Sequence, residues 1–350
     1  LSVNGILRPT ALRWSPSENR LLVVGGDHSL TVVDSRHGTI VARAVSHSLP
    51  GIVVSLSDDG QRVAVADKIG AVHIYDADGT LDEVITTGHT LPVSHLAWQP
   101  GGIWLATGSG GLFAESDRTV RLWDTSGMNP DIVIYMEAIG ERDTNAVLDL
   151  TWSFDGARIA VSDLTGNILI VNPEGSPYVP WSYLRVTEPD GRESFRSPIS
   201  FLRWSHNGTR LAGTYYDSGG IYPMAWIPQT RTLGGIGLVT DGDRMRIEGG
   251  VGDVAWRPDG RWVLMRWIKH AHNFSPENMQ PSIQIEGLDP VTRLLAGLPR
   301  GVSSGGLSPD GLRAYGYDGQ GAAALWDAES GAVLKRWANG AGGALWSPNS

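Results

Sequence analysis

The sequence predicts an all-β protein made of many short strands joined by tight turns, and three observations support this. The chain of 350 residues contains 45 glycines, which allow the positive φ angles of tight turns. It also contains 14 tryptophans, whose large flat side chains suit packing between layers of sheet. The third observation is a pattern of three apolar runs separated by a turn and a loop, which is most complete in residues 88–124 and recurs along the chain.

Each copy of the pattern is anchored by an apolar residue, usually tryptophan, that ends its first run and precedes a turn. Seven such units, each with room for four strands, predict a seven-bladed β-propeller of four-stranded antiparallel blades, with eight blades as the alternative. We expect a single domain, 1–350, with blades near 10–46, 47–88, 89–138, 139–187, 188–248, 249–298 and 299–338. The anchors lie 42 to 54 residues apart and are Trp14, Leu56, Trp98, Trp152, Trp204, Trp256 and Leu307.

The runs within a unit predict the order of strands in a blade. The first run alternates, as in 93–98, and suits an inner strand near the axis. The second, as in 62–66, is the most apolar and should be buried between neighbouring blades. The third ends in an aromatic or apolar residue followed by Asp or Asn, as in Trp123-Asp124. The fourth is more polar and suits an outer edge that faces water, as at 40–45, 83–87, 132–137 and 332–337.

The end of the sequence repeats its beginning. Residues 344–349 restart the pattern that begins at 12–16. We therefore expect 339–350 either to open a further repeat of a longer parent protein or to supply a strand that closes the ring.

Composition excludes several classes of function. The net charge of −9 disfavours a nucleic-acid partner, because phosphate binding depends on Lys and Arg. The absence of cysteine excludes disulfides, thiolate metal sites and cysteine nucleophiles, but it does not assign a compartment. No apolar run approaches 18 residues, so we expect a soluble protein with no membrane insertion.

The chain resembles the WD-repeat β-propeller family, and the likeness extends over essentially all of it. Gly88-His89 and Trp123-Asp124 match the two dipeptides of the family signature, and Trp326-Asp327 repeats the second. The resemblance implies a structural hydrogen-bond relay inside one blade. It would consist of His89, Thr107, Asp117 and Trp123.

The same resemblance implies that links between second and third strands share a face with links between blades. Insertions at 110–116, 139–145, 185–198, 215–222 and 269–281 fall largely on that face. We therefore expect a non-enzymatic platform that presents inserted loops to a partner protein, or to other domains of a longer parent chain. The candidate binding residues are Phe113, Glu115, Arg142, Phe195, Arg196, Tyr216, Tyr222, His270, His272 and Phe274.

Motifs that could carry chemistry are better explained by structure. Gly301–Gly305 matches the G-x-S-x-G nucleophile motif, but no helix is expected to follow it. His270 and His272 have a spacing that metals can use, without a third ligand nearby. Asp76–Gly79 and the glycosylation sequon at Asn207 suit hairpin turns. We assign no catalytic residue, metal or cofactor.

The alternative is an enzyme, or a small-ligand or carbohydrate binder, that uses the axial funnel where inner strands begin. It rests on the range of activities that propellers host. The residues that would line this funnel are His47, Leu91, Asn145, Ser197 and Ser303.

Overall fold

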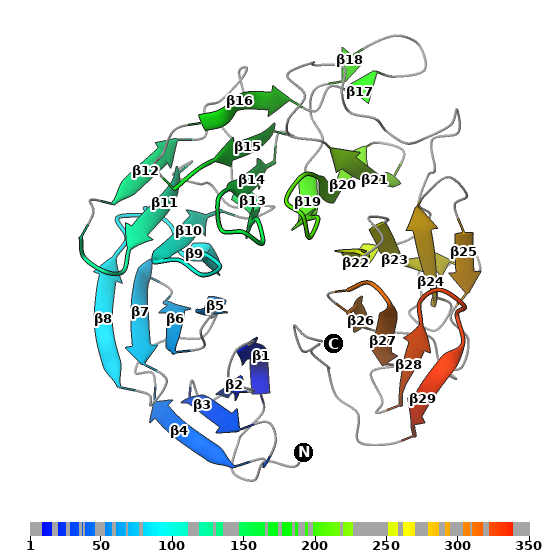
Figure 1. The fold of residues 1–350 in the computed structure, drawn as a ribbon, viewed down its shortest axis with the longest axis horizontal. Coiled ribbons are helices and arrows are strands. Elements are labelled where there is room, and N and C mark those ends of the chain that lie inside the picture. Colours follow the sequence, from blue (N-terminus) through cyan, green and yellow to red (C-terminus); the bar gives the residue numbers. More distant parts are fainter. Residues whose placement is uncertain are drawn as a thin grey trace. The chain divides into compact units, whose positions relative to one another are not determined.

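The fold was obtained as a computed structural model of the chain, which forms two compact units, 1–198 and 199–350. Each unit is described by itself (Figure 1). The structure describes residues 9–15, 20–25, 29–34, 37, 39–45, 53–57, 61–67, 69–76, 80–110, 119–128, 131–135, 147–164, 167–173, 177–183, 186–187, 193–194, 199–217, 220–226, 251–257, 262–269, 279–286, 291–294, 304–308, 310–317 and 322–338.

The first unit contains four antiparallel sheets of four strands and one short hairpin. The first sheet consists of β1 (Pro9–Ser15), β2 (Arg20–Gly25), β3 (Ser29–Asp34) and β4 (Ile40–Val45). The second consists of β5 (Val53–Leu56), β6 (Arg62–Ala66), β7 (Ala71–Asp76) and β8 (Leu81–Thr86). The third consists of β9 (Val93–Trp98), β10 (Trp104–Ser109), β11 (Thr119–Asp124) and β12 (Ile132–Tyr135). The fourth consists of β13 (Val147–Trp152), β14 (Ile159–Asp163), β15 (Asn167–Val171) and β16 (Pro177–Tyr183), and the hairpin of β17 (Val186–Thr187) and β18 (Glu193–Ser194).

The second unit contains three further antiparallel sheets. The first consists of β19 (Ile199–Trp204), β20 (Leu211–Asp217) and β21 (Gly220–Trp226). The second consists of β22 (Val251–Trp256), β23 (Trp262–Lys269), β24 (Met279–Glu286) and β25 (Val291–Leu294). The third consists of β26 (Ser304–Leu307), β27 (Arg313–Tyr317), β28 (Ala323–Asp327) and β29 (Val333–Trp337). No helix occurs within the described ranges, and none there could cross a membrane.

Strand order follows chain order in every sheet, and the burial of the strands follows the expected order. Among the strands whose side chains are described, second strands are the most buried. All five residues of β14 are buried, whereas five of the six residues of β8, a fourth strand, are exposed. The prediction of an all-β chain of antiparallel sheets is therefore confirmed.

The core of the first unit lies between successive sheets. Residues on one face of β6, such as Val63 and Val65, pack with Leu22 of the preceding sheet. Ala64 and Ala66, which alternate with them, pack with Leu105 and Trp123 of the following sheet, among others. Because successive side chains of a strand point to opposite faces, a strand that is apolar at every position is buried on both sides.

The first turn of several sheets is fixed by one recurring set of hydrogen bonds. Ser153 Oγ accepts the N–H of Arg158 at 3.0 Å and donates to Asp155, whose Oδ1 accepts the N–H of Ala157. A Cβ on Gly156 would lie 2.4 Å from the Pro100 carbonyl oxygen of the neighbouring sheet, and the φ angle of Gly156 is +67°. Turns at 205–210 and 308–313 repeat these bonds, with Ser205-Asn207-Arg210 and Ser308-Asp310-Arg313. The predicted turn at Asn207 is confirmed.

Two of the anchor tryptophans join successive sheets through their indole N–H groups. Trp152 Nε1 donates to the Ala97 carbonyl oxygen at 3.0 Å. Trp256 Nε1 donates to the Arg203 carbonyl oxygen at 2.8 Å. These two anchors therefore end the first strand of their sheets and also bond to the preceding sheet.

Candidate functional site

The turn between β6 and β7 lies against the link between the second and third sheets. A Cβ on Gly70 would be 3.4 Å from the carbonyl oxygen of Leu91 and 3.7 Å from Thr87 Oγ1. The expectation that second–third turns share a face with links between blades holds at this position. We call residues 67 and 69–71 together with 87–92 the loop face of the second sheet.

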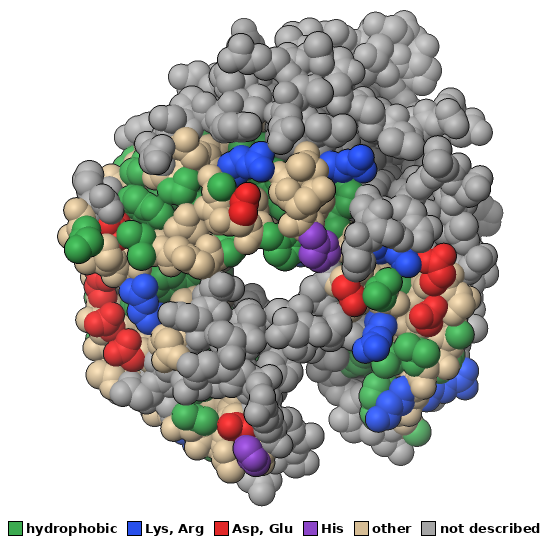
Figure 2. Space-filling view, viewed as in Figure 1, with side chains coloured by type: hydrophobic (Ala, Val, Ile, Leu, Met, Phe, Trp, Pro, Cys, Tyr) green, Lys and Arg blue, Asp and Glu red, His purple; other side chains and the backbone are tan. Residues whose placement is uncertain are grey.

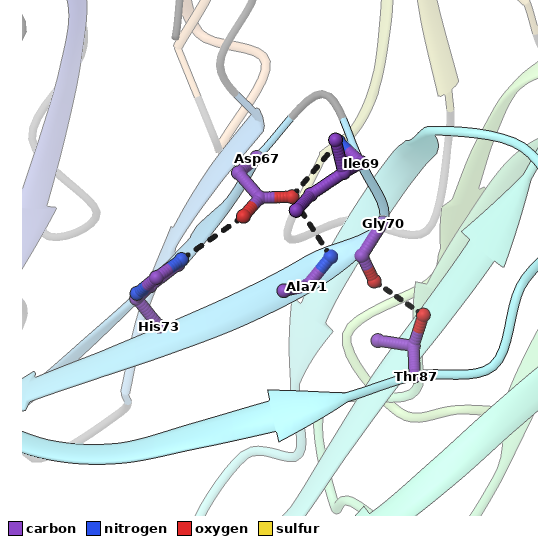
Figure 3. A network of polar contacts seen from close by, with 6 residues as sticks. All are labelled: Asp67, Ile69, Gly70, Ala71, His73 and Thr87. Carbon is purple, nitrogen blue, oxygen red and sulfur yellow. Dashed lines mark hydrogen bonds and ion pairs between the residues drawn. The ribbon is translucent and has the colours of Figure 1, made fainter. Parts of the chain in front are cut away.

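The Asp67 carboxylate organises this turn (Figure 3). Its Oδ1 accepts the backbone N–H groups of Ile69 at 3.0 Å and Ala71 at 2.8 Å. Its Oδ2 lies 3.0 Å from Nε2 of His73 on the neighbouring strand β7. Asp67 is buried, and three contacts compensate the loss of hydration of its carboxylate.

The rest of the turn is held by Thr87 and by a glycine conformation. Thr87 Oγ1 donates to the Gly70 carbonyl oxygen at 2.5 Å. Gly70 has a φ of +86°, which residues with a Cβ rarely adopt. The side chain of Ile69 is 80% exposed at the tip. The turn is therefore fixed at both ends while it presents an apolar side chain to solvent.

Three of the four residues of the expected relay are in contact in the third sheet. Trp123 Nε1 donates to Thr107 Oγ1 at 3.0 Å, and His89 Nε2 lies 2.8 Å from the same oxygen. The other nitrogen, His89 Nδ1, lies 3.2 Å from Thr119 Oγ1. Asp117 lies outside the described residues. Thr119 was not expected to contact the imidazole.

The predicted binding residues of the fifth blade lie in strands. Tyr216 belongs to β20 and Tyr222 to β21, where the pairs Tyr216–Ile221 and Tyr215–Tyr222 continue the ladder. The prediction of a loop at 215–222 was wrong there, because added residues on both sides of a hairpin can pair with each other and satisfy their backbone groups.

Most of the other predicted binding and axial residues lie outside the described residues. Leu91 is described, and it is half-buried on the loop face. The segment 304–307 of the G-x-S-x-G region is strand β26, and strand β27 follows it, so the strand-to-helix elbow is absent at this place. The residues outside are Phe113, Glu115, Arg142, Phe195, Arg196, His270, His272, Phe274, His47, Asn145, Ser197 and Ser303.

Two polar side chains on neighbouring inner strands were not predicted. His95 on β9 has its Nδ1 2.8 Å from Ser94 Oγ. Burial lowers the pKa of His95, and the negative charge of Asp149 on β13 opposes this shift. No group of three or more potential metal ligands is present in the described part of the chain.

Sequence reasoning missed Ile69 of the loop face and His73, the β7 residue that contacts Asp67. Asp67 was recognised as a recurring Asp after a second strand, but no feature of the sequence paired it with a histidine six positions later. The pairing of β6 with β7 would have predicted this contact, because it places His73 opposite Val65, two residues before Asp67.

Comparisons with known proteins agree with the architecture. The family model "WD domain, G-beta repeat" matches residues 82–124. No curated protein sequence matches the chain.

Two similar solved structures extend the likeness to most of the chain. One is a chain of a mitotic checkpoint complex, which is 19% identical over 91% of this chain and 87% of its own length, with a TM-score of 0.58. The other is the Cps50 (Swd1) β-propeller domain of Myceliophteria thermophila, which is 15% identical over 96% and 98%, with a TM-score of 0.56.

Proposed function

We propose that this chain, which carries a WD repeat and has the fold of WD-repeat β-propellers, is a platform for protein–protein interaction. In this proposal seven blades form one ring, and the loop face receives the partner protein. The match to a WD repeat and the two propeller neighbours, one of them in a complex, support a role in protein interaction in general. The contacts around Asp67 support the choice of face.

The choice of this face rests mainly on one observation, the exposed side chain of Ile69 at the tip of a turn that hydrogen bonds hold in place. An apolar side chain on a mobile loop loses conformational entropy on binding, which reduces affinity. The Ile69 turn is held by Asp67 and by Thr87, and its tip is exposed. Rigid apolar anchors of this kind contribute most to protein interfaces when they enter a pocket of the partner.

The test compares two exposed apolar residues, Ile69 and Met128, that lie in turns at opposite ends of the strands. Ile69→Asp changes the loop face, whereas Met128→Asp changes the turn after β11, where the side chain is 86% exposed. Third–fourth turns lie at the opposite end of the strands from second–third turns. Partners cross-linked to the protein in its native cells would be quantified by mass spectrometry.

We expect Ile69→Asp to reduce capture of at least one partner by about tenfold or more, as for an interface anchor that contributes more than about 1.4 kcal/mol. Met128→Asp should capture the same partners as the unmodified chain. Both variants should retain the original melting temperature, because neither side chain is buried. Equal loss or equal retention of partners in the two variants would argue against the loop face as the binding surface.

A further inference from the structure

The last strand of each four-stranded sheet is an edge that pairs with no further strand among those the structure describes. Strand β8 ends the second sheet and β29 ends the third sheet of the other unit. Both strands are largely exposed, at five of six positions in β8 and at the three central positions of β29. Exposed edges of this kind can pair with another chain, and proteins usually protect them with charged side chains.

Strand β8 combines acidic and apolar side chains. Asp82 and Glu83 are exposed between Leu81, 49% exposed, and Val84, 47% exposed. Partial burial raises the pKa of Glu83, the nearby carboxylates of Asp82 and Asp131 raise it further, and the positive charge of Arg62 opposes this shift. Acidic side chains gather over the β8 region of the surface in Figure 2. This edge therefore carries two adjacent acidic side chains, Asp82 and Glu83, with the Asp131 carboxylate of the next sheet nearby.

Strand β29 has the opposite charge. Lys335 and Arg336 are exposed beside Leu334, which is 52% exposed. The Lys335 Nζ atom lies 5.2 Å from the centre of the Trp337 ring, so part of this side chain is held against the edge. Neither cation makes an ion pair with another described residue.

Charged side chains do not keep the β8 edge of one molecule away from the β29 edge of another, because the two edges carry opposite charges. Like charges on two edges keep copies of a protein apart, but an acidic edge and a basic edge attract each other. Strand β4, which also ends a four-stranded sheet, carries a single charged residue, the exposed cation Arg43, and lacks this complementarity. A second copy of this chain supplies the matching charge and the matching apolar side chains at once.

We propose that the β8 edge of one molecule docks against the β29 edge of a second copy. The contact joins two different surfaces, so it is heterologous, and each molecule retains one edge of each kind for further copies. Both strands carry a bulge near their start, at Asp82 and at Leu334. The regular ladder resumes at Glu83 and Lys335, so these residues begin the segments that can align.

The association should be weak and sensitive to salt. The net charge of −9 repels two copies in general, and exposed ion pairs are screened by ions. We expect a dissociation constant on the order of 10 µM at low salt, weakened about tenfold or more at 0.5 M NaCl. Sedimentation equilibrium over a range of protein concentrations measures both values.

Charge reversal tests the proposal directly. The double variants Asp82→Lys/Glu83→Lys and Lys335→Glu/Arg336→Glu should each remain monomeric at concentrations where the unmodified chain associates. An equimolar mixture of the two should associate again, because the acidic β8 of one variant then faces the basic β29 of the other. Arg43→Glu on β4 is the control and should associate as the unmodified chain does. Circular dichroism melts establish that all variants are folded.

Three outcomes would overturn the proposal. The unmodified chain could be monomeric at all concentrations, or either reversal could leave association unchanged. The mixture of folded variants could also fail to associate, which would show that an acidic β8 edge and a basic β29 edge do not dock against each other.

Discussion

At the residue scale, Thr107 joins a buried histidine to a buried tryptophan in the third sheet. The hydroxyl of Thr107 contacts both His89 Nε2 and Trp123 Nε1, and His89 Nδ1 lies close to Thr119. Buried polar atoms that lose a partner keep their desolvation cost, so removal of the imidazole should destabilise the fold. Nothing in this geometry exposes His89 to a partner protein.

We expect His89→Ala to lower the free energy of unfolding by about 1–3 kcal/mol. His37→Ala is the matched control, because its imidazole is exposed and contacts only Asp34 among the described residues. That control should change stability by less than about 0.5 kcal/mol. Urea unfolding followed by tryptophan fluorescence measures both. Equal stability of the two variants would contradict a structural role for His89.

Residues that share a recurring pattern could be predicted from the sequence, whereas pairings between strands could not. His89, Thr107 and Trp123 stand at positions that a known repeat marks, so their contacts were expected. The His73–Asp67 pair and the Thr119 contact depend on the register of neighbouring strands, which the apolar pattern does not specify. The candidate binding residues were chosen for their residue types and for insertions expected on one face, and Tyr216 and Tyr222 proved to continue strands.

At the element scale, the first turns show how different side chains produce one conformation. Asp155 Oδ1 and Asn207 Oδ1 occupy the same place, and each accepts a serine hydroxyl and a backbone N–H two residues on. The aspartate differs from the asparagine in its charge. The hydrogen bond from Ser153, followed by the one from the Ala157 N–H, lowers the pKa of Asp155.

A pH series on this turn separates charge from shape. A carboxylate whose pKa is lowered by folding stabilises the protein above its ordinary pKa, and this contribution disappears as the pH falls through the lowered value. We therefore expect Asp155→Asn to be less stable than the original at pH 7. The difference should shrink as the pH falls below the ordinary aspartate pKa and through the lowered pKa of Asp155. Asp155→Ala should lose about 0.5–1.5 kcal/mol at neutral pH, since it also removes the acceptor.

Guanidinium unfolding at several pH values provides the measurement. Asn207→Asp is the complementary variant and should gain stability at neutral pH as Asp155→Asn loses it. A difference between Asp155→Asn and the original that does not depend on pH would contradict the assigned role of the charge.

At the scale of the whole molecule, each sheet of the first unit depends on its neighbours. The clusters that contain Leu22, Leu105 and Ala106 each combine residues of two successive sheets, so no sheet there has a core of its own. The alternation of apolar residues made this arrangement predictable, because a strand that is apolar on both faces requires two covering layers. The closed ring and its number of blades both stay predictions, the number from the spacing of the anchors.

A ring in which every blade is covered by two others should unfold in one cooperative step. Ser153 and Ser205 make the same turn bonds in the two compact units, so they form a matched pair. If each serine-to-alanine change costs about 1 kcal/mol, each should shift a single calorimetric transition of a 350-residue ring by about 1–2 °C. The van't Hoff and calorimetric enthalpies should then agree. Two transitions, one moved only by Ser153→Ala and the other only by Ser205→Ala, would show that the units unfold separately and would contradict the single ring.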